Sequence, residues 1–146
     1  MLKIRKMTLG DAEEVKEMMR VFYASEAVMT NGSEEIFESN VKACLAEGVP
    51  LEGLIFDDGG KTAGYAMLAD GFSTEFGKPC LWVEDLYIKP EHRRKGIGRA
   101  FFEYIDKNYR GHIIRLEAER ENLPAVKLYE SCGFEELPYL ELKKEI

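Results

Sequence analysis

Cysteine is scarce in this sequence and follows no pattern. The three cysteines are an odd set, and their spacing matches no metal-ligand motif: Cys44, Cys80 and Cys132. We therefore expect no disulfide framework and no metal site, which suits a reducing cytoplasm. A chain of 146 residues buries ~68–70% of its unfolded surface. Residues 1–146 are therefore expected to fold as one domain without crosslinks.

Long apolar runs and an excess of basic residues are also missing. No run approaches the about 20 apolar residues that a membrane helix needs, and no N-terminal segment has the pattern of a signal peptide. We expect no membrane partner and a cytoplasmic location. The net charge is −7, from 20 basic and 27 acidic residues. This balance argues against a nucleic-acid partner, because nucleic-acid binders are normally basic, and it favours cationic partners such as amines.

Apolar spacing and turn signals divide the chain into short strands and amphipathic helices. The expected strands are 2–7, 51–56, 61–69, 81–88, 112–118 and 139–143. The expected helices are 8–27 and 33–48, a third from residue 97 onward, and a fourth over 122–133. Three consecutive strands followed by β-α units predict an α/β (α+β) fold, a mixed sheet with helices on both faces.

Single residues support several of these boundaries. Ser33 is expected to cap the second helix, and Gly133 to end the last one. Turn signals indicate a turn at 31–32, a hairpin turn at 57–60 and a loop at 70–79. Gly64, inside a strand, indicates a bulge or a close backbone neighbour.

The central stretch 81–99 predicts a strand, a basic turn and a helix. Four cations in seven residues accompany two glycines in the turn: Arg93, Arg94, Lys95 and Arg99, with Gly96 and Gly98. The first amides of a helix lack internal partners, and the helix dipole places positive charge there. A glycine without Cβ also lets a bulky anion approach the backbone. The turn is therefore expected to bind an anion such as a diphosphate.

Two common phosphate-binding motifs are absent. In a dinucleotide fingerprint, the first glycine directly follows the strand, whereas Gly96 lies eight residues after Ile88, and Phe101 occupies the place of the third glycine. No G-x-x-x-x-G-K-[ST] loop is present either. A dinucleotide and a nucleoside triphosphate are thus excluded as the expected ligands.

The turn Arg93-Arg94-Lys95-Gly96-Ile97-Gly98 resembles motif A, [R/Q]-x-x-G-x-[G/A], of the GNAT superfamily of acyl-CoA-dependent N-acyltransferases. The segment 122–134 matches every fixed position of the family's motif B, N-x-x-A-x-x-x-Y-x-x-x-G-F. The resemblance spans nearly the whole chain. It implies the GNAT fold: a mixed, mostly antiparallel sheet of about six or seven strands with helices on both faces. In the family, two central strands diverge at one end to form a slot for the pantetheine arm.

The resemblance implies acetyl-CoA as co-substrate and assigns residues to it. Asn122 corresponds to an asparagine that contacts the cofactor, and Tyr129 to a tyrosine whose hydroxyl lies beside the sulfur. Without a ligand, Asn122 would be an ordinary N-cap and Tyr129 an ordinary core aromatic. The remaining cofactor residues come from the central strand, which pairs with pantetheine, and from the turn: Leu86, Tyr87, Ile88, Arg93, Arg94, Lys95, Gly96, Ile97, Gly98 and Arg99.

Two carboxylates interrupt the otherwise apolar central strand. Alternation places Glu84 and Asp85 on opposite faces, and burial would raise a carboxylate pKa towards the range of a general base. The run 83–88 is similar to the strand of diamine and polyamine acetyltransferases in which the glutamate of a Glu-Asp pair is the base. This implies Glu84 as the base, with Asp85 next; alternatively, both only line the sheet end. His92 and His112 are weaker candidates, and no signature supports a Cys80 hydrolase.

In the family, the acceptor cleft is formed by the first two helices and the loop between the third and fourth strands. Here these segments carry aromatic and acidic side chains, which suit a small cationic amine: Phe22, Tyr23, Glu26, Glu34, Glu35, Phe72, Glu75 and Phe76. The expected function is an acetyl-CoA-dependent N-acetyltransferase acting directly on a primary amine. The alternatives are a protein or peptide N-acetyltransferase and a non-catalytic acyl-CoA-binding regulatory module. Many members form homodimers through their last strands, for which Tyr139, Leu140 and Leu142 are available.

Overall fold

The computed structural model describes residues 1–28 and 32–146. None of the described helices is long and apolar enough to cross a membrane. Two single 3₁₀ turns, η1 (Leu9–Asp11) and η2 (Pro90–His92), join larger elements. These larger elements are β1 (Leu2–Lys6), α1 (Ala12–Tyr23), α2 (Glu34–Leu45), β2 (Leu51–Asp58), β3 (Lys61–Ser73), β4 (Lys78–Ile88), α3 (Ile97–Asn108), β5 (Ile113–Leu116) and α4 (Leu123–Ser131).

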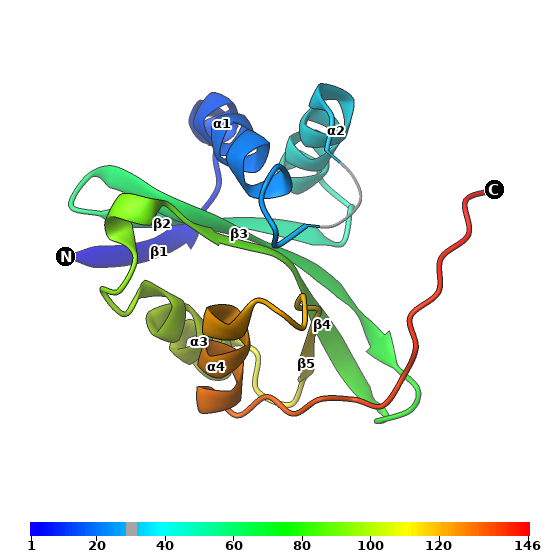
Figure 1. The fold of residues 1–146 in the computed structure, drawn as a ribbon. Coiled ribbons are helices and arrows are strands. Elements are labelled where there is room, and N and C mark those ends of the chain that lie inside the picture. Colours follow the sequence, from blue (N-terminus) through cyan, green and yellow to red (C-terminus); the bar gives the residue numbers. More distant parts are fainter. Residues whose placement is uncertain (29–31) are drawn as a thin grey trace.

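The strands form one five-stranded sheet whose spatial order follows the chain, β1-β2-β3-β4-β5. The first four strands are antiparallel, and β5 runs parallel to β4. Figure 1 shows α1 and α2 over one face of the sheet and α3 and α4 over the other. The predicted mixed α/β sheet with helices on both faces is confirmed.

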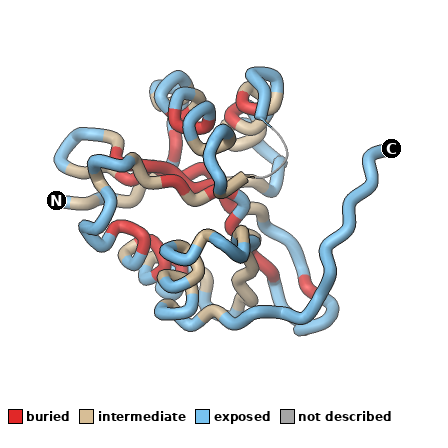
Figure 2. The backbone as a smooth tube through the Cα atoms, viewed as in Figure 1, coloured by how far each residue is buried: buried red, intermediate tan, exposed pale blue. Residues whose placement is uncertain are grey.

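Each face of the sheet has its own hydrophobic core, because the central strands are buried on both sides (Figure 2). In β2, Leu54 and Phe56 pack towards α3, while Ile55 between them packs towards α1 and α2. On the α3 side, the rings of Phe56 and Phe101 lie 5.5 Å apart. This two-sided burial makes the sheet a rigid support for the residues at its edge.

Three predictions made from single residues are confirmed: two helix boundaries and one close contact between strands. The Ser33 hydroxyl accepts a hydrogen bond from the Ile36 amide at 3.2 Å and caps α2. Gly133 follows α4 with φ +96°, a conformation that glycine adopts without strain. A Cβ on Gly64 would overlap the carbonyl oxygen of Tyr87, so this glycine allows β3 and β4 to approach closely. Asn31, in the expected turn at 31–32, lies outside the described residues.

The strand predicted at 139–143 is wrong. Residues beyond α4 form no helix or strand, and Figure 1 shows this C-terminal segment leaving the body of the protein. Leu140 and Leu142 are 83% and 82% exposed. The Tyr139 hydroxyl donates to a carboxylate oxygen of Glu75 at 2.6 Å, which ties the segment to the β3–β4 turn and away from the outer edge of β5. The described sheet therefore has five strands instead of six or seven.

Two further predictions need correction. The loop expected at 70–79 is instead the end of a hairpin, because β3 continues to Ser73 and pairs there with Lys78. The Ser73 hydroxyl accepts a hydrogen bond from the Phe76 amide at 3.3 Å and closes the turn. The first helix ends at Tyr23, earlier than the predicted residue 27, and a 3₁₀ turn precedes it.

Candidate active site

The free edge of β4 is the structural centre of the candidate site. Pairing between β4 and β5 ends at Val83 and Leu116. From there to Ile88, β4 pairs with β3 on one side, and within residues 1–28 and 32–146 no strand pairs with its other side. Figure 1 shows β4 continuing past the end of β5. Between residues 86 and 88, the backbone edge of β4 that faces away from β3 is thus available to an extended ligand, apart from the Ile88 carbonyl, which accepts a hydrogen bond from Arg93 Nε at 2.8 Å.

A β-bulge lies where this free edge begins. On β3, Met67 pairs with Asp85, and the next residue, Leu68, pairs with Val83. Glu84 is therefore an extra residue without a partner on β3. A bulge of this kind re-aims side chains and is over-represented beside active sites.

The bulge also reverses which side chains face which helices. Before it, Leu81 and Val83 pack on the α3 side; after it, Leu86 and Ile88 do so, and Asp85 points to the α1–α2 side. The simple alternation assumed from the sequence does not hold across the bulge. The shift of the aliphatic residues from odd to even positions was the signal that could have revealed it.

The Glu84 side chain is exposed at the bulge. Its pKa is raised, first by partial desolvation and then by the negative charges of Asp85 and Glu141. A raised pKa improves a carboxylate as a proton acceptor near neutral pH. The Glu84 carboxylate is therefore in contact with solvent.

Asp85, in contrast, is 5% exposed. One of its carboxylate oxygens accepts a hydrogen bond from the Tyr23 hydroxyl at 2.9 Å, and the other accepts from the Tyr65 hydroxyl at 2.7 Å. Burial raises the pKa of Asp85, while the two hydroxyl donors act in the opposite direction. The Tyr23 and Tyr65 side chains cover the Asp85 carboxylate and separate it from an amine substrate in solution.

The turn before α3 contains two residues with positive φ, Arg94 and Gly96. Gly96, the N-cap residue of α3, has φ +79°, and a Cβ there would meet open space. Arg94 has φ +62°, an uncommon value for a residue with a side chain. Such positive-φ turns aim successive backbone N–H groups towards one point.

Gly98 has a different role from the one predicted. It is buried, and a Cβ there would lie 2.7 Å from Leu128 of α4 and 3.7 Å from Ile88 of β4. This glycine therefore allows α3 to pack closely against α4 and β4, instead of leaving room for an anion. Ile97, beside it, is also buried in the core.

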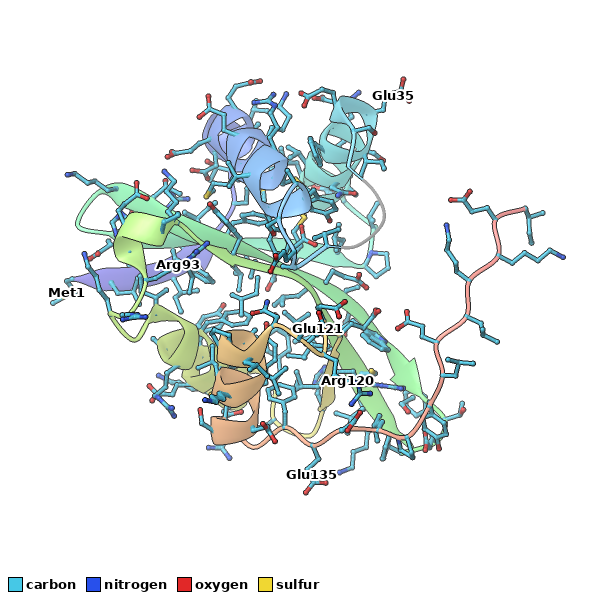
Figure 3. All side chains as sticks on the ribbon, in the orientation of Figure 1. Met1, Glu35, Arg93, Arg120, Glu121 and Glu135 are labelled. Atoms are coloured by element: carbon cyan, nitrogen blue, oxygen red, sulfur yellow. The ribbon has the colours of Figure 1, made fainter. Side chains whose placement is uncertain are left out.

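The four cations of the turn divide into two pairs. Arg93, labelled in Figure 3, donates from Nε to the Ile88 carbonyl at 2.8 Å and lies 5.7 Å from the Tyr87 ring centroid. Arg99 donates to the Ser131 hydroxyl at 2.9 Å. These two arginines brace the turn against β4 and α4. Arg94 and Lys95 are exposed between them and carry positive charge on the surface of the turn.

The two motif B residues lie at opposite ends of α4: Asn122 directly precedes the helix, and Tyr129 lies near its end. Asn122 occupies the N-cap position, but its side chain makes no capping hydrogen bond within the described residues, so the ordinary capping role does not occupy it. Tyr129 packs edge-on against Phe102, with ring centroids 5.7 Å apart. Burial raises the pKa of Tyr129, which keeps its hydroxyl protonated at neutral pH. The hydroxyl can therefore donate a proton.

Sequence reasoning missed two carboxylates near Glu84. Glu117 directly follows β5, and the C-terminal segment brings Glu141 next to it. The hydrogen bond with Glu141, then burial, then the charges of Glu141 and Glu84 raise the pKa of Glu117 to about 7. Figure 3 shows the neighbouring residues Glu121 and Arg120 on the loop after β5. The signal was the position of Glu117 at the end of a strand that diverges from its neighbour.

The predicted acceptor residues do not gather in one place. Phe22 and Tyr23 lie beside Asp85, because Tyr23 bonds it and Phe22 packs on Tyr23. Glu34 is paired with Arg20 at 2.8 Å. Glu35 lines a hollow of about 560 Å³ on α2, and Figure 3 shows it far from Glu121. Glu26 lies in the exposed turn after α1, and Phe72 is exposed near the end of β3. Glu75 and Phe76 lie in the turn between β3 and β4.

The histidines and Cys80 show no catalytic arrangement. His92 Nδ1 lies 3.5 Å from Asp58, and His112 Nε2 lies 3.7 Å from Asp70. Cys80 is buried, and burial is the main cause that raises its pKa. A buried thiol with a raised pKa is a poor nucleophile.

Known proteins match both the sequence and the fold. Residues 15–134 match the family model described as acetyltransferase (GNAT) family. An uncharacterized N-acetyltransferase of Bacillus subtilis strain 168, YhfO, is 32% identical over 142 residues, which cover 92% of this chain and 91% of that protein.

Two solved structures illustrate the likeness in fold. A possible acetyltransferase from Clostridium difficile 630 superposes with a TM-score of 0.81 at 23% identity, covering 99% of this chain and 97% of that one. A predicted acetyltransferase from Clostridium acetobutylicum, solved with acetyl-CoA, gives a TM-score of 0.76 at 20% identity, covering 98% and 96%. The family match spans most of the chain and includes the diverging strands and the glycine turn, so this protein is an N-acetyltransferase of the GNAT family.

Proposed function

We propose that this protein transfers the acetyl group of acetyl-CoA directly to the primary amine of a small cationic molecule. The observation that carries the proposal is the unpaired edge of β4, which begins at the bulged Glu84 and leads to the glycine turn before α3. This arrangement supports an extended acyl carrier along the strand, with its diphosphate at the turn. The carboxylates Glu84, Glu117 and Glu141 at the other end favour a positively charged acceptor.

The residues that would hold the co-substrate fit this assignment. The backbone at 86–88 would pair with the pantetheine arm, and the amides after Gly96, with Arg94 and Lys95, would bind the diphosphate. Asn122 is available because its side chain does not cap α4. When bound, acetyl-CoA supplies an activated thioester.

Glu84 removes the proton that blocks attack. A primary amine with a lysine-like pKa of ~10.4 is mostly cationic at neutral pH and has no free lone pair. Glu84 accepts one proton, directly or through water, and the raised pKa of its carboxyl group suits this transfer. The amine nitrogen can then form a bond to the acetyl carbon.

Two other groups stabilise the charges that develop. Backbone N–H groups on the free β4 edge near Leu86 and Tyr87 would donate to the oxyanion. Tyr129 would give its hydroxyl proton to the sulfur as the carbon–sulfur bond breaks, because a free thiol has a pKa near ~8.5 and is released more readily when protonated. As the amide forms, the nitrogen loses a second proton, which restores the Tyr129 hydroxyl through water, and Glu84 returns its proton to solvent. The products are an acetamide, the free thiol of CoA and one released proton.

The proposal predicts that Glu84→Gln and Tyr129→Phe each lower kcat by about 10²–10⁴-fold, the range for loss of a general base or acid. The assay measures thiol release from acetyl-CoA with putrescine, spermidine, an aminoglycoside, single amino acids and a lysine peptide. Matched controls are Glu130→Gln, an exposed residue on α4, and Tyr104→Phe, a partly buried residue on α3. Both controls are expected to keep wild-type kcat.

The assay separates the competing functions. Turnover on the lysine peptide alone would replace the small amine with a protein acceptor. Tight CoA binding in calorimetry without turnover on any acceptor would favour the non-catalytic binding module. Wild-type activity in Glu84→Gln would remove Glu84 from the mechanism.

A further inference from the structure

We infer that Asp85 is a positioning residue for the transfer reaction, an inference that rests on the proposed function. Anchored by Tyr23 and Tyr65, its carboxylate fixes the β4 bulge and thereby holds Glu84 in its outward orientation.

The first argument is the completeness of the Asp85 site. A carboxylate buried to this degree is costly unless both oxygens have donors. Here both do, and the second oxygen accepts from Tyr23 as well, at 3.1 Å. Tyr23 is the last residue of α1, and Tyr65 lies in β3. Three elements that are distant in the chain therefore meet at one side chain.

The second argument is the position of this anchor relative to the bulge. Asp85 is the first residue after Glu84, and it resumes pairing with β3 opposite Met67. Removing the extra residue from the bulge would turn Asp85 away from the two tyrosines and towards the α3 side. The two hydrogen bonds therefore favour the bulged register, which leaves Glu84 outside the regular pairing.

The third argument is electrostatic. The groups that face Asp85 are Tyr23 from α1, Tyr65 from β3, Cys44 from α2 and Glu84 on its own strand. Burial and the charge of Asp85 raise the pKa of both tyrosines, so both remain neutral donors. Burial, followed by the charge of Asp85, raises the pKa of the Cys44 thiol to about 12. Asp85 also acts on Glu84, because the charge of Asp85 is the second cause, after burial, that raises the pKa of Glu84.

The test compares Asp85→Asn, Tyr65→Phe and Tyr23→Phe with Tyr109→Phe. Tyr109 is a matched control because its hydroxyl also donates to a carboxylate, that of Glu52 at 2.6 Å, outside the candidate site. We expect the first three variants to lose about 10- to 100-fold in kcat, as misplacement of a reacting group does. The KM for acetyl-CoA should stay within about twofold of wild type, and Tyr109→Phe should keep wild-type kcat.

The pH dependence separates positioning from a general loss of folding. Asp85 raises the pKa of Glu84, so Asp85→Asn should move the acid limb of kcat/KM to lower pH. A ¹³C NMR titration of the Glu84 carboxyl group should show the same downward shift without any turnover. The tyrosine variants keep the Asp85 carboxylate and serve if Asp85→Asn fails to fold.

The outcomes are distinct. Wild-type kcat in Asp85→Asn and Tyr65→Phe would overturn the inference. A kcat that falls only with the folded fraction, while the acid limb and the NMR titration stay in place, would also overturn it. If the wild-type protein released no thiol from acetyl-CoA with any acceptor, the proposed function would fail. The NMR titration would then still test the effect of Asp85 on Glu84. An unchanged Glu84 pKa in Asp85→Asn would overturn that effect, and a lowered Glu84 pKa would support it.

Discussion

At the scale of single residues, the Asp11 side chain links β1 to the turn that precedes α1. Its two carboxylate oxygens accept hydrogen bonds from Arg5 of β1, both at 2.9 Å. One of these oxygens also accepts from the Thr8 amide at 2.8 Å, which completes the cap before α1. The hydrogen bond from Arg5 is the main cause that lowers the pKa of Asp11 to about 2.

We predict that Asp11→Asn lowers the free energy of unfolding by about 1–2 kcal/mol at pH 7, the upper range for loss of a cap residue. Because the folded-state pKa lies below the ordinary aspartate pKa of 3.8, the carboxylate stabilises the protein fully above that value. This stabilisation is lost as the pH falls towards about 2. Urea unfolding at pH 7 and pH 3 should therefore show a smaller difference at pH 3. The exposed Asp106→Asn should change stability little at either pH.

Residue-level predictions succeeded where the signal is local. The cap at Ser33 and the turn at Gly96 depend on neighbours within a few positions, and both are present. The partners of Asp85 could not be predicted, because Tyr65 lies 20 positions away and Tyr23 lies 62 positions away in the chain. A hydrogen bond between such residues is set by packing of whole elements.

At the scale of elements, the contact between β3 and β4 depends on one missing side chain. Gly64 pairs with Ile88, and a Cβ there would overlap the backbone of β4. A backbone atom cannot rotate away as a flexible side chain can. The close approach of these strands therefore requires glycine at this position.

We predict that Gly64→Ala destabilises the fold by about 1–3 kcal/mol, the usual cost of overpacking. It should also weaken CoA binding, because the displaced segment of β4 belongs to the free edge. Gly71→Ala is the matched control: it lies on the same strand with ordinary φ, and its added methyl group meets open space. Chemical unfolding and CoA calorimetry on both variants test this, and equal stability of the two would contradict it.

Helices and strands were predicted correctly where the spacing of apolar residues and the turn signals indicated the same element. The order of elements as far as α4 is confirmed. The bulge at Glu84 escaped notice because one inserted residue changes the phase of alternation without altering composition. The strand expected at 139–143 failed because β-propensity does not form a strand without a paired edge.

At the scale of the whole molecule, the C-terminal segment brings Glu141 close to Glu117 before it leaves the body of the protein, and so places like charges together. Glu117 and Glu141 share a hydrogen bond, and an ion pair of 2.6 Å between Arg120 and Glu136 holds the segment nearby. A hydrogen bond between two carboxyl groups requires a proton on one of them. The contact should therefore weaken as the pH rises.

We predict that the wild-type protein is less stable at pH 8 than at pH 5, and that Glu117→Gln reduces this difference. Since the folded-state pKa of about 7 exceeds the ordinary glutamate pKa of 4.5, the folded protein retains a proton that the unfolded chain has released. The stabilisation is therefore lost as the pH rises from about 4.5 through about 7. Thermal melts at both pH values test this, with Glu130→Gln as the control. The same pH dependence in both variants would contradict the prediction.

The order of the sheet has a consequence for how the chain finds its fold. Strands that are neighbours in the sheet are also neighbours in the chain, and only Gly59 and Gly60 separate β2 from β3. Closing such short loops costs little entropy, so the β2–β3–β4 meander can form early from nearby contacts. A parallel neighbour needs a crossover, so β5 joins only after α3 has spanned the gap. Residues 84–88 of β4, which carry the candidate site, therefore gain their neighbour β3 before β5 pairs with residues 80–83.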